Sequence, residues 1–357
     1  MNVLFFGMGV SAVAEPTEQA KLQSKDLKEM TENKTKRKNI EGKEENRELI
    51  QENGSDFYRF MVCDFHGIAR CKYITKSAFP SMRKRGPGMA WKTVLLSFDN
   101  YFNCDATRLD GVRCTDARCT PAEDMKVPRA LPWAGEGDYS VGGVFCETFW
   151  GIDGLQQQAC PRYIARRLCD QLEADHKLKI FHASEMEFAV FNEKREPLFE
   201  EGCLYIPQQF AYLEKEFLYL SDMCEKAGIP IETLQTEFAP GQIEVVLKPC
   251  FGIEGADNEF LFKNAVKEIL QKPDQPWRAT FMSKPLIDKT GASNHYNHSL
   301  WRAKEDGTTE DAMWDEHSES GLTSVAEYWL AGILKHSAAM SGKLTTDCNS
   351  NIIISIR

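Results

Sequence analysis

The chain has 357 residues, of which 42% are hydrophobic and 27% are charged, and its formal net charge is −10. At about 150 residues per domain, this length predicts roughly two domains with a sizeable core. The acidic balance argues against a general binder of nucleic acids or of anionic membranes. No apolar run approaches the roughly 20 residues that a bilayer requires, so a transmembrane helix is not expected.

The twelve cysteines are spread along the chain, without a Cys-x-x-Cys pair or a cysteine–histidine cluster at zinc spacing. In a chain of this length the pattern predicts reduced thiols and a cytoplasmic protein. The first residues, MNVLFFGMGVSAVAEP, form a short apolar stretch. No Lys or Arg precedes Lys21, so this stretch is not predicted to be an export signal.

The first part of the chain, residues 1–55, is predicted to be a disordered charged tail. After residue 15 it is dominated by Lys, Glu, Asn and Gln, and such a segment buries too little apolar surface to offset its ordering entropy. Folding is expected to begin near Phe57, where 57–64 and 68–74 are typical of the two strands of a hairpin. Strand-like segments continue without a long helical pattern, which predicts a small β-rich N-terminal domain over residues 56–150.

A second domain is predicted over residues 151–357, where Pro161 opens a helix and strand and helix patterns then alternate. The polar residues of interest lie on the strands, which indicates an α+β fold with a curved sheet whose concave face carries a site. The expected strands are 178–191, 230–238, 243–248, 278–285 and 294–300, and the expected helices are 208–227, 257–271 and 324–340.

Two acidic segments carry the first candidate residues. In SEMEFAVF, Glu185 and Glu187 are two residues apart, so a strand directs both carboxylates to one face and places Met186 on the other. In EFAPGQIEVV, the Pro-Gly pair predicts a turn that sets Glu237 directly opposite Glu244. Like charges in that position are destabilising, which favours a bound cation, although a solvated acidic face is the alternative.

The third segment, GASNHYNHSLW, supplies a histidine. Strand alternation places His295, Asn297 and Ser299 on one face, with Tyr296 and His298 on the other. One imidazole beside several carboxylates suits Mg²⁺ or Mn²⁺ better than structural zinc. The sequence contains no Walker-type phosphate loop, no G-x-G-x-x-G motif after a strand and no G-x-S-x-G elbow.

In this order, these segments resemble the catalytic half of the glutamine synthetases. The resemblance extends to CPRYIARR and WLAGILKHSAA, and more weakly to FYRFMVCDFHGIARCK, so that it covers about residues 57–346. Within the superfamily, FGIEGADNEFLFKNAVKEI and LAGILKHSAAMS are most similar to the lengsin branch of the eye lens. The resemblance implies a β-grasp-like N-terminal domain and a catalytic domain with a curved antiparallel sheet and flanking helices.

By position, the resemblance implies that Glu187, Glu237 and Glu244 hold one divalent ion. Glu185 and His295 would belong to a second ion, which bridges ATP and the transferring phosphate. The implied reaction is attack of the glutamate γ-carboxylate on ATP, giving an acyl phosphate that ammonia displaces, with the metals neutralising phosphoryl charge.

Substrate contacts are implied in the same way. Gly291 and His295 would contact glutamate, Asn297 and Ser299 would contact the nucleotide, and Glu237 would stabilise the incoming ammonium as a catalytic group. The implied partners are the small molecules glutamate, ammonia and ATP, together with other copies of the chain in a ring-shaped homo-oligomer.

Departures from the family pattern keep other functions open. Family synthetases have His where this chain has Asn297, and Asn where it has Thr290. The resemblance stops near Thr346, so an incomplete catalytic domain is expected, lacking the arginines that grip glutamate and phosphate. The chain as written is therefore not expected to be a competent ligase. The alternatives are a non-catalytic, lengsin-like structural or cytoskeleton-associated oligomer, and a ligase for another amine or carboxylate.

Overall fold

The computed structural model describes residues 50–344, except 65–66, 91–115, 152–153 and 273–275, together with a short strand at Ile354–Ile356. The predicted tail therefore lies outside the described residues up to position 49. Of residues 50–55, Ile50 and Ser55 are buried and 51–54 are exposed, and the Gln51 N–H donates to the Lys126 carbonyl. The end of the segment expected to be a tail, residues 50–55, therefore contacts the rest of the described chain.

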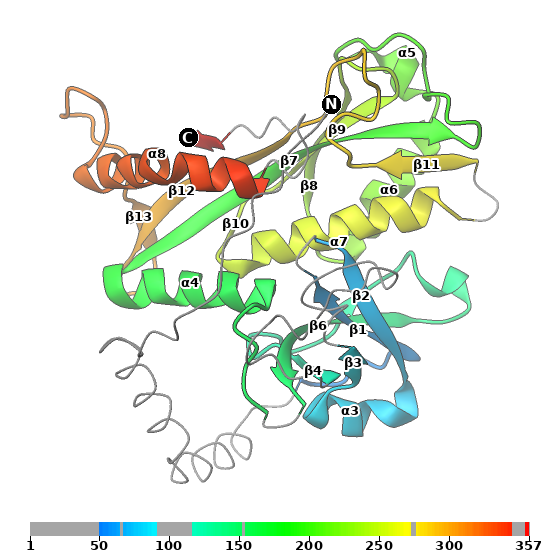
Figure 1. Ribbon diagram of the computed structural model, residues 1–357, viewed down its shortest axis with the longest axis horizontal. Coiled ribbons are helices and arrows are strands. Elements are labelled where there is room, and N and C mark those ends of the chain that lie inside the picture. The colour runs from blue at the N-terminus through cyan, green and yellow to red at the C-terminus, as the bar shows by residue number, and fades with distance from the viewer. Residues whose placement is uncertain are drawn as a thin grey trace, which may run out of the picture. The chain divides into compact units, whose positions relative to one another are not determined.

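Two β-sheets organise the described chain (Figure 1). The first has the order β2-β1-β6-β4-β3, with β5 paired to β6. The predicted hairpin is confirmed as the antiparallel pair β1–β2, and β1 also runs parallel to β6. Its elements are β1 Phe57–Cys63, β2 Ala69–Thr75, the short helix α3 Phe79–Arg85, β3 Gly88–Ala90, β4 Asp116–Pro121, β5 Arg129–Ala130 and β6 Val141–Trp150.

The second sheet has the order β13-β12-β7-β9-β8. Strands β10 and β11 also pair with β7, and β14 pairs with β12. The long strand β7 is therefore the axis on which this sheet is built. The strands are β7 Leu178–Asn192, β8 Ile231–Thr236, β9 Gln242–Leu247, β10 Cys250–Phe251, β11 Trp277–Thr280, β12 Asn294–Ala303, β13 Thr309–Asp311 and β14 Ile354–Ile356.

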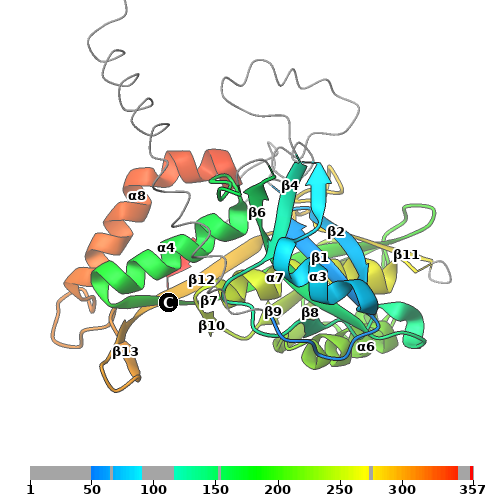
Figure 2. The same ribbon diagram turned by 90° about the horizontal axis from the view of Figure 1, so that it is seen from below.

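Helices lie along this second sheet (Figures 1 and 2). The helix opened by Pro161 is confirmed as α4, whereas the single helix expected at 208–227 is divided by a break after Phe210. The strand expected at 278–285 ends at Thr280. The helices are α4 Pro161–His176, α5 Pro207–Phe210, α6 Glu214–Lys226, α7 Ile253–Leu270 and α8 Ser324–Leu344. None of the described helices combines the length and the apolar character that crossing a membrane requires.

One hydrophobic core joins the two sheets. It contains Met61 and Phe145 from the first sheet, Met186 and Phe188 from β7, and residues of α6 and α7 such as Phe262. The alternation of β7 explains this arrangement, because its even-numbered residues face the helices and its odd-numbered residues face away. The opposite face of β7, which carries Glu185 and Glu187, is called its open face below.

Candidate metal and substrate site

The odd-numbered residues of β7 carry the first two candidate ligands, as predicted. Met186 and Phe188 are fully buried, and the Phe188 ring packs against Phe217 of α6 and Phe262 of α7. Glu185 and Glu187 therefore project from the opposite face of the strand. Burial of the apolar side chains fixes the direction of the carboxylates.

The predicted opposition of Glu237 and Glu244 is wrong. Gln235 is the β8 residue opposite Glu244, and Glu187 lies opposite Glu244 on the other side of β9. The register differs because the connecting loop is longer than expected: the Glu237 N–H donates to the Gln242 carbonyl at 3.0 Å. Gly241 closes this loop with φ +67°, where a Cβ would lie 2.6 Å from the Val190 carbonyl oxygen. A like-charge pair does exist, but it is Glu187 with Glu244 and it joins β7 to β9.

The surroundings of Glu244 and Glu237 raise the pKa of both carboxyl groups. Burial, followed by the charges of Glu237, Glu187 and Glu185, raises the pKa of Glu244 to about 7. Burial and the Glu187 charge also raise the pKa of Glu237. Gln235 offsets part of this repulsion, since its amide donates to Glu244 at 2.7 Å and to Glu237 at 3.4 Å. Four carboxylates therefore share one electrostatic environment, in which added positive charge would be favourable.

Glu187 is held by three hydrogen bonds from the protein. The Ser293 hydroxyl donates to Oε1 and the Ser293 N–H donates to Oε2 at 3.0 Å. The Gln242 amide donates to Oε2 at 2.6 Å and also to the Gly291 carbonyl at 3.0 Å. Ser293, Gln242 and Gln235 were not predicted from the sequence. Ser293 could have been found, because it precedes His295 by two residues.

His295 completes the group of charged residues. It lies opposite Glu185 across β7 and β12, and its Nδ1 is 3.0 Å from Glu185 Oε2. Its Nε2 lies 3.3 Å from the Ser293 hydroxyl. The predicted juxtaposition of one imidazole with the acidic strand is therefore confirmed.

The other candidate residues occupy neighbouring positions. Asn297 lies opposite Ala183, and its side-chain oxygen is buried with no hydrogen-bond partner among the described residues. The Ser299 hydroxyl accepts a hydrogen bond from the Trp301 indole at 2.9 Å. Gly291 lies in the loop that Gln242 ties to Glu187. Their roles in binding nucleotide and glutamate remain predictions.

The donor set suits a hard divalent ion, because it consists of carboxylates and one imidazole in a region of unbalanced negative charge. Within the described part of the chain, however, no three His, Cys, Asp or Glu side chains are grouped closely enough to hold an ion. The reason lies in the hydrogen bonds above: Glu187 is turned to Ser293, Glu244 to Gln235 and Glu185 to His295. The ligand types fit a cation, but the arrangement seen here is internally satisfied.

A partly buried carboxylate supports the strands from the helix side. Glu259 of α7 accepts hydrogen bonds from Ser184 of β7 at 2.6 Å and from Asn294 of β12 at 3.0 Å, and it pairs with Lys263. Ser184 and Asn294 directly precede Glu185 and His295 in the sequence. Glu259 therefore holds β7 and β12 together on the face that packs against the helices, directly behind the positions of Glu185 and His295.

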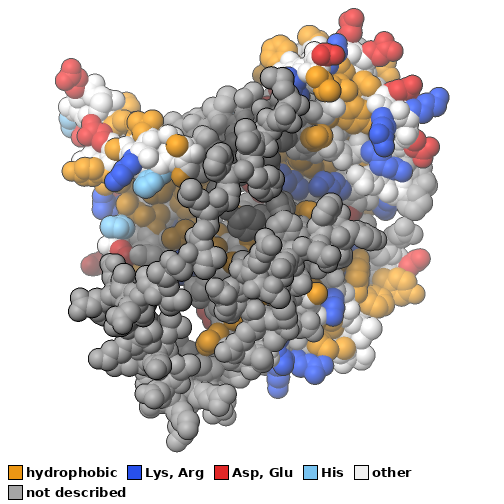
Figure 3. All heavy atoms as spheres, viewed as in Figure 1, with side chains coloured by type: hydrophobic (Ala, Val, Ile, Leu, Met, Phe, Trp, Pro, Cys, Tyr) orange, Lys and Arg blue, Asp and Glu red, His pale blue; other side chains and the backbone are white. Residues whose placement is uncertain are grey.

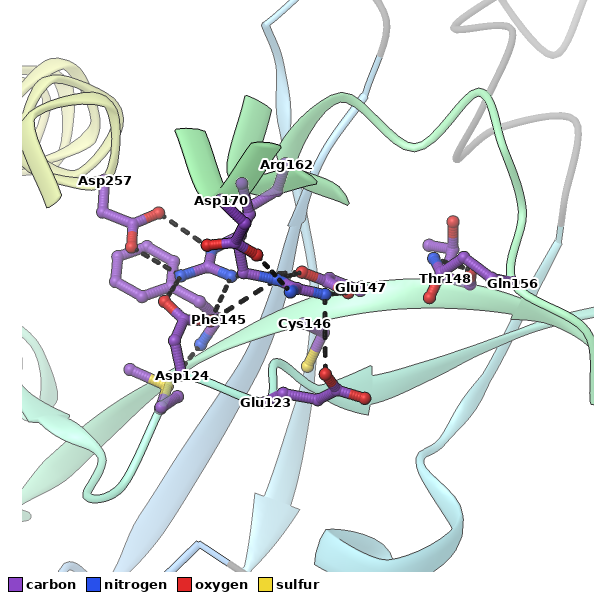
Figure 4. Close-up of polar contacts among 12 residues, drawn as sticks. Glu123, Asp124, Phe145, Cys146, Glu147, Thr148, Gln156, Arg162, Asp170 and Asp257 are labelled. Carbon is purple, nitrogen blue, oxygen red and sulfur yellow. Dashed lines mark hydrogen bonds and ion pairs between the residues drawn. The ribbon is translucent and has the colours of Figure 1, made fainter. Parts of the chain in front are cut away.

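A second network joins α4 to β6 of the first sheet and to α7 (Figure 4). Arg162 forms paired hydrogen bonds with Asp124, at 2.8 and 2.6 Å, and with Asp257 of α7, at 3.0 and 2.8 Å. Arg166 forms a similar pair with Glu147 of β6, at 2.6 and 2.9 Å. These contacts give two of the three arginines of CPRYIARR, Arg162 and Arg166, a structural role as links between β6 and the helices α4 and α7.

Figure 3 shows one face of the molecule, with the described side chains coloured by type. On the coloured part of that face, acidic and basic side chains are interspersed rather than gathered by sign. A cavity of about 540 Å³ is lined by Phe191, Arg195, Arg278 and Leu286, among others, and contains none of the candidate ligands. The carboxylates of β7 and β9 thus remain the strongest candidate site in the described chain.

Comparison with protein families gives the origin of this arrangement. Residues 158–351 match the glutamine synthetase catalytic domain, and this span is more than half of the chain. The chain belongs to the glutamine synthetase family. All the candidate residues, from Glu185 to Ser299, lie inside the matched span.

Among its relatives, the chain is 27% identical to lengsin of Canis lupus familiaris over 297 residues, which cover 82% of this chain and 48% of that protein. It is 26% identical to lengsin of Homo sapiens, with 83% and 55% covered. It is 30% identical over 263 residues to a glutamine synthetase of Staphylococcus aureus, with 70% and 55% covered. The chain is therefore a lengsin-like family member that spans about half the length of these curated relatives.

Solved structures share the fold. A structure described as a novel glutamine synthase homolog has a TM-score of 0.67 at 19% identity, covering 82% of this chain and 66% of its own. A structure titled GmaS/ADP complex-Conformation 1 has a TM-score of 0.69 at 20% identity, covering 83% and 64%. The expected α+β fold of the glutamine synthetases is thereby confirmed.

Proposed function

We propose that the open face of β7 carries the divalent-cation part of a glutamine synthetase-type ligase site. The observation that supports this most strongly is the opposition of Glu187 and Glu244 across β7 and β9, beside the Glu185–His295 pair. Nothing in the packing of the strands requires acidic residues there. A bound cation gives a physical reason for a repulsion that otherwise destabilises the sheet.

In this proposal Glu187, Glu237 and Glu244 hold one ion, either Mg²⁺ or Mn²⁺, and Glu185 with His295 serves a second. The ions, when bound, would neutralise the phosphate charge of ATP. In the absence of an ion, Ser293, Gln242 and Gln235 hold the carboxylates through the hydrogen bonds described above. An ion would need Glu187 and Glu244 to turn away from those donors.

The remaining residues would orient the reactants of a glutamate–ammonia ligase. Gly291 and His295 would face glutamate, whose γ-carboxylate attacks ATP to give γ-glutamyl phosphate. Glu237, a buried carboxylate, would hold the ammonium and accept its proton before ammonia displaces the phosphate. Asn297 and Ser299 would contact the nucleotide. The unpartnered oxygen of Asn297 supports this assignment, as does the ADP named for a structural neighbour.

A non-catalytic, lengsin-like role is the second candidate. It is supported by the lengsins among the relatives, and by the hydrogen bonds that satisfy the candidate ligands without an ion. In that case the chain would act as a structural or cytoskeleton-associated oligomer. A ligase for another amine or carboxylate is a third candidate, which differs from the first in substrate rather than in the cation site.

We further propose that the protein is cytoplasmic and forms a ring-type homo-oligomer. All nine cysteines in the described part of the chain are free thiols, which is typical of a reducing compartment. Oligomerisation is supported by membership of the family. Sedimentation of the purified chain would distinguish a ring from a monomer.

The test combines ion binding with catalysis. Calorimetric titration with MnCl₂ is expected to give a binding signal that is lost in Glu244→Gln and retained in Glu225→Gln, which changes an exposed glutamate of α6. Incubation with ATP, glutamate and hydroxylamine is then expected to give γ-glutamyl hydroxamate. Binding without product would favour the lengsin-like or other-substrate candidates. Equal binding by wild type and Glu244→Gln would contradict the cation site.

A further inference from the structure

Ser293 contacts a candidate ligand of each proposed ion. Its hydroxyl donates to Glu187 Oε1 and lies 3.3 Å from His295 Nε2, while its backbone N–H donates to Glu187 Oε2 at 3.0 Å. It lies immediately before β12, where alternation places it on the same face as His295.

These contacts use most of the acceptor capacity of Glu187. A carboxylate oxygen accepts along about two lone-pair directions. On Oε2 both are occupied, by the Ser293 N–H and by the Gln242 amide at 2.6 Å. On Oε1 the Ser293 hydroxyl takes one. One acceptor direction of Oε1 remains, so an ion that takes more of Glu187 than this single direction must compete with hydrogen bonds to a charged group, which are among the stronger ones in proteins.

The grouping of the side chains agrees with this competition. The strand register sets Glu187 beside Glu244, yet the described residues contain no cluster of three potential ligands at ion-binding geometry. The backbone thus brings the ligands together and the side-chain hydrogen bonds keep them apart. Ser293 is the donor whose hydroxyl can be removed without changing the loop that Gln242 braces.

We propose that the Ser293 hydroxyl is an internal competitor for the divalent cation, which holds Glu187 in a closed, self-satisfied arrangement and so weakens ion binding. This inference rests on the proposed cation site. It assigns Ser293 a restraining role, in contrast to the supporting role of many groups that hydrogen-bond metal ligands, whose loss weakens binding about 10–100-fold. The two roles predict opposite changes in ion affinity when the Ser293 hydroxyl is removed.

The test is a titration with Mn²⁺ in which electron paramagnetic resonance measures the concentration of the free ion. Ser293→Ala is expected to bind about tenfold more tightly than wild type, because one hydrogen bond to a charged group no longer has to be broken. Ser293→Thr keeps the hydroxyl and should bind like wild type. Ser81→Ala removes an exposed hydroxyl that contacts the Ala78 carbonyl, and is the matched control.

The outcomes separate the inference from the site. Wild-type binding with equal or weaker binding by Ser293→Ala overturns the inference and leaves the cation site standing. Binding by Ser293→Ala alone supports the inference in its strongest form. Failure of every variant to bind overturns the site and the inference together. Ser293→Cys, whose thiol is a weak donor, is expected to tighten binding in the same direction and replaces Ser293→Ala if that protein does not fold.

Discussion

At the scale of single residues, the site is defined by carboxylates that repel one another and by neutral groups that restrain them. Glu187 and Glu244 face each other across two strands, and Glu244 carries the raised pKa that this position causes. The amides of Gln235 and Gln242 donate to these carboxylates without adding charge. The repulsion is therefore reduced but not removed. As a result, the stability of the metal-free protein should depend measurably on pH.

Removing the charge of Glu244 is expected to stabilise the metal-free protein above neutral pH. The pKa of Glu244 is about 7 in the folded protein and would be about 4.3 in an unfolded chain. Between these values the folded state binds more protons, so its stability decreases as the pH rises. Glu244→Gln should reduce this decrease, leaving the part that comes from Glu237, and raise Tm by about 1–2 °C for each 1 kcal/mol recovered.

The measurement is thermal unfolding in EDTA across this pH range, with the exposed Glu225→Gln as the control. A Tm for Glu244→Gln below that of wild type at alkaline pH would contradict the account. Such a result would mean that the carboxylate of Glu244 stabilises the fold through contacts that an amide cannot make.

At the scale of elements, alternation along β7 and β12 was readable in the sequence, and the turn between β8 and β9 was not. Burial of Met186 and Phe188 requires only a period of two, so the faces of Glu185, Glu187 and His295 could be predicted. The register of Glu237 depends on how many residues the loop contains. That number is set by the close approach of Gly241 to Val190, a tertiary contact that no local pattern reports.

Side-chain partners were equally hidden from the sequence. Ser293 and Gln242 reach Glu187 from another segment of the chain, and Gln235 reaches Glu244 from the neighbouring strand. Serine and glutamine are common polar residues, and these three form no recognisable sequence motif. The candidate ligands could thus be predicted, whereas the hydrogen bonds that restrain them required the structure.

Glu259 provides a prediction at the same scale, because it connects α7 to β7 and β12 behind the site. Glu259→Ala leaves Lys263 without its partner and removes the acceptor of Ser184 and Asn294. The free energy of unfolding should fall by about 2 kcal/mol, as for the loss of a hydrogen bond to a charged group. Urea denaturation measures this, with the exposed Glu225→Ala as control. Equal destabilisation by both variants would contradict a supporting role for Glu259.

At the scale of the whole molecule, the charge network of α4 holds the first sheet to the second. Arg162 is almost fully buried between Asp124 and Asp257, and Glu147 is buried beside it. Burial raises the pKa of Asp257 even though the Arg162 guanidinium acts in the opposite direction. The carboxylates therefore depend on the arginine for charge compensation.

Arg162→Met is expected to lower the free energy of unfolding by about 3–5 kcal/mol, because it leaves buried carboxylates uncompensated. The double variant Arg162→Met with Asp257→Asn should recover part of that loss. Arg302→Met removes a largely exposed ion pair with Glu310, and should cost about 1 kcal/mol or less. Urea denaturation compares the three. If Arg162→Met costs no more than Arg302→Met, the network does not hold the sheets together.

The most direct test of the cation site is anomalous diffraction from crystals of the protein soaked in MnCl₂. The account predicts a manganese peak on the open face of β7, within ligand distance of Glu187 and Glu244. The same soak of Glu244→Gln crystals should give a weaker peak or none. Manganese bound elsewhere on the protein, with no peak beside these two carboxylates, would contradict the central claim.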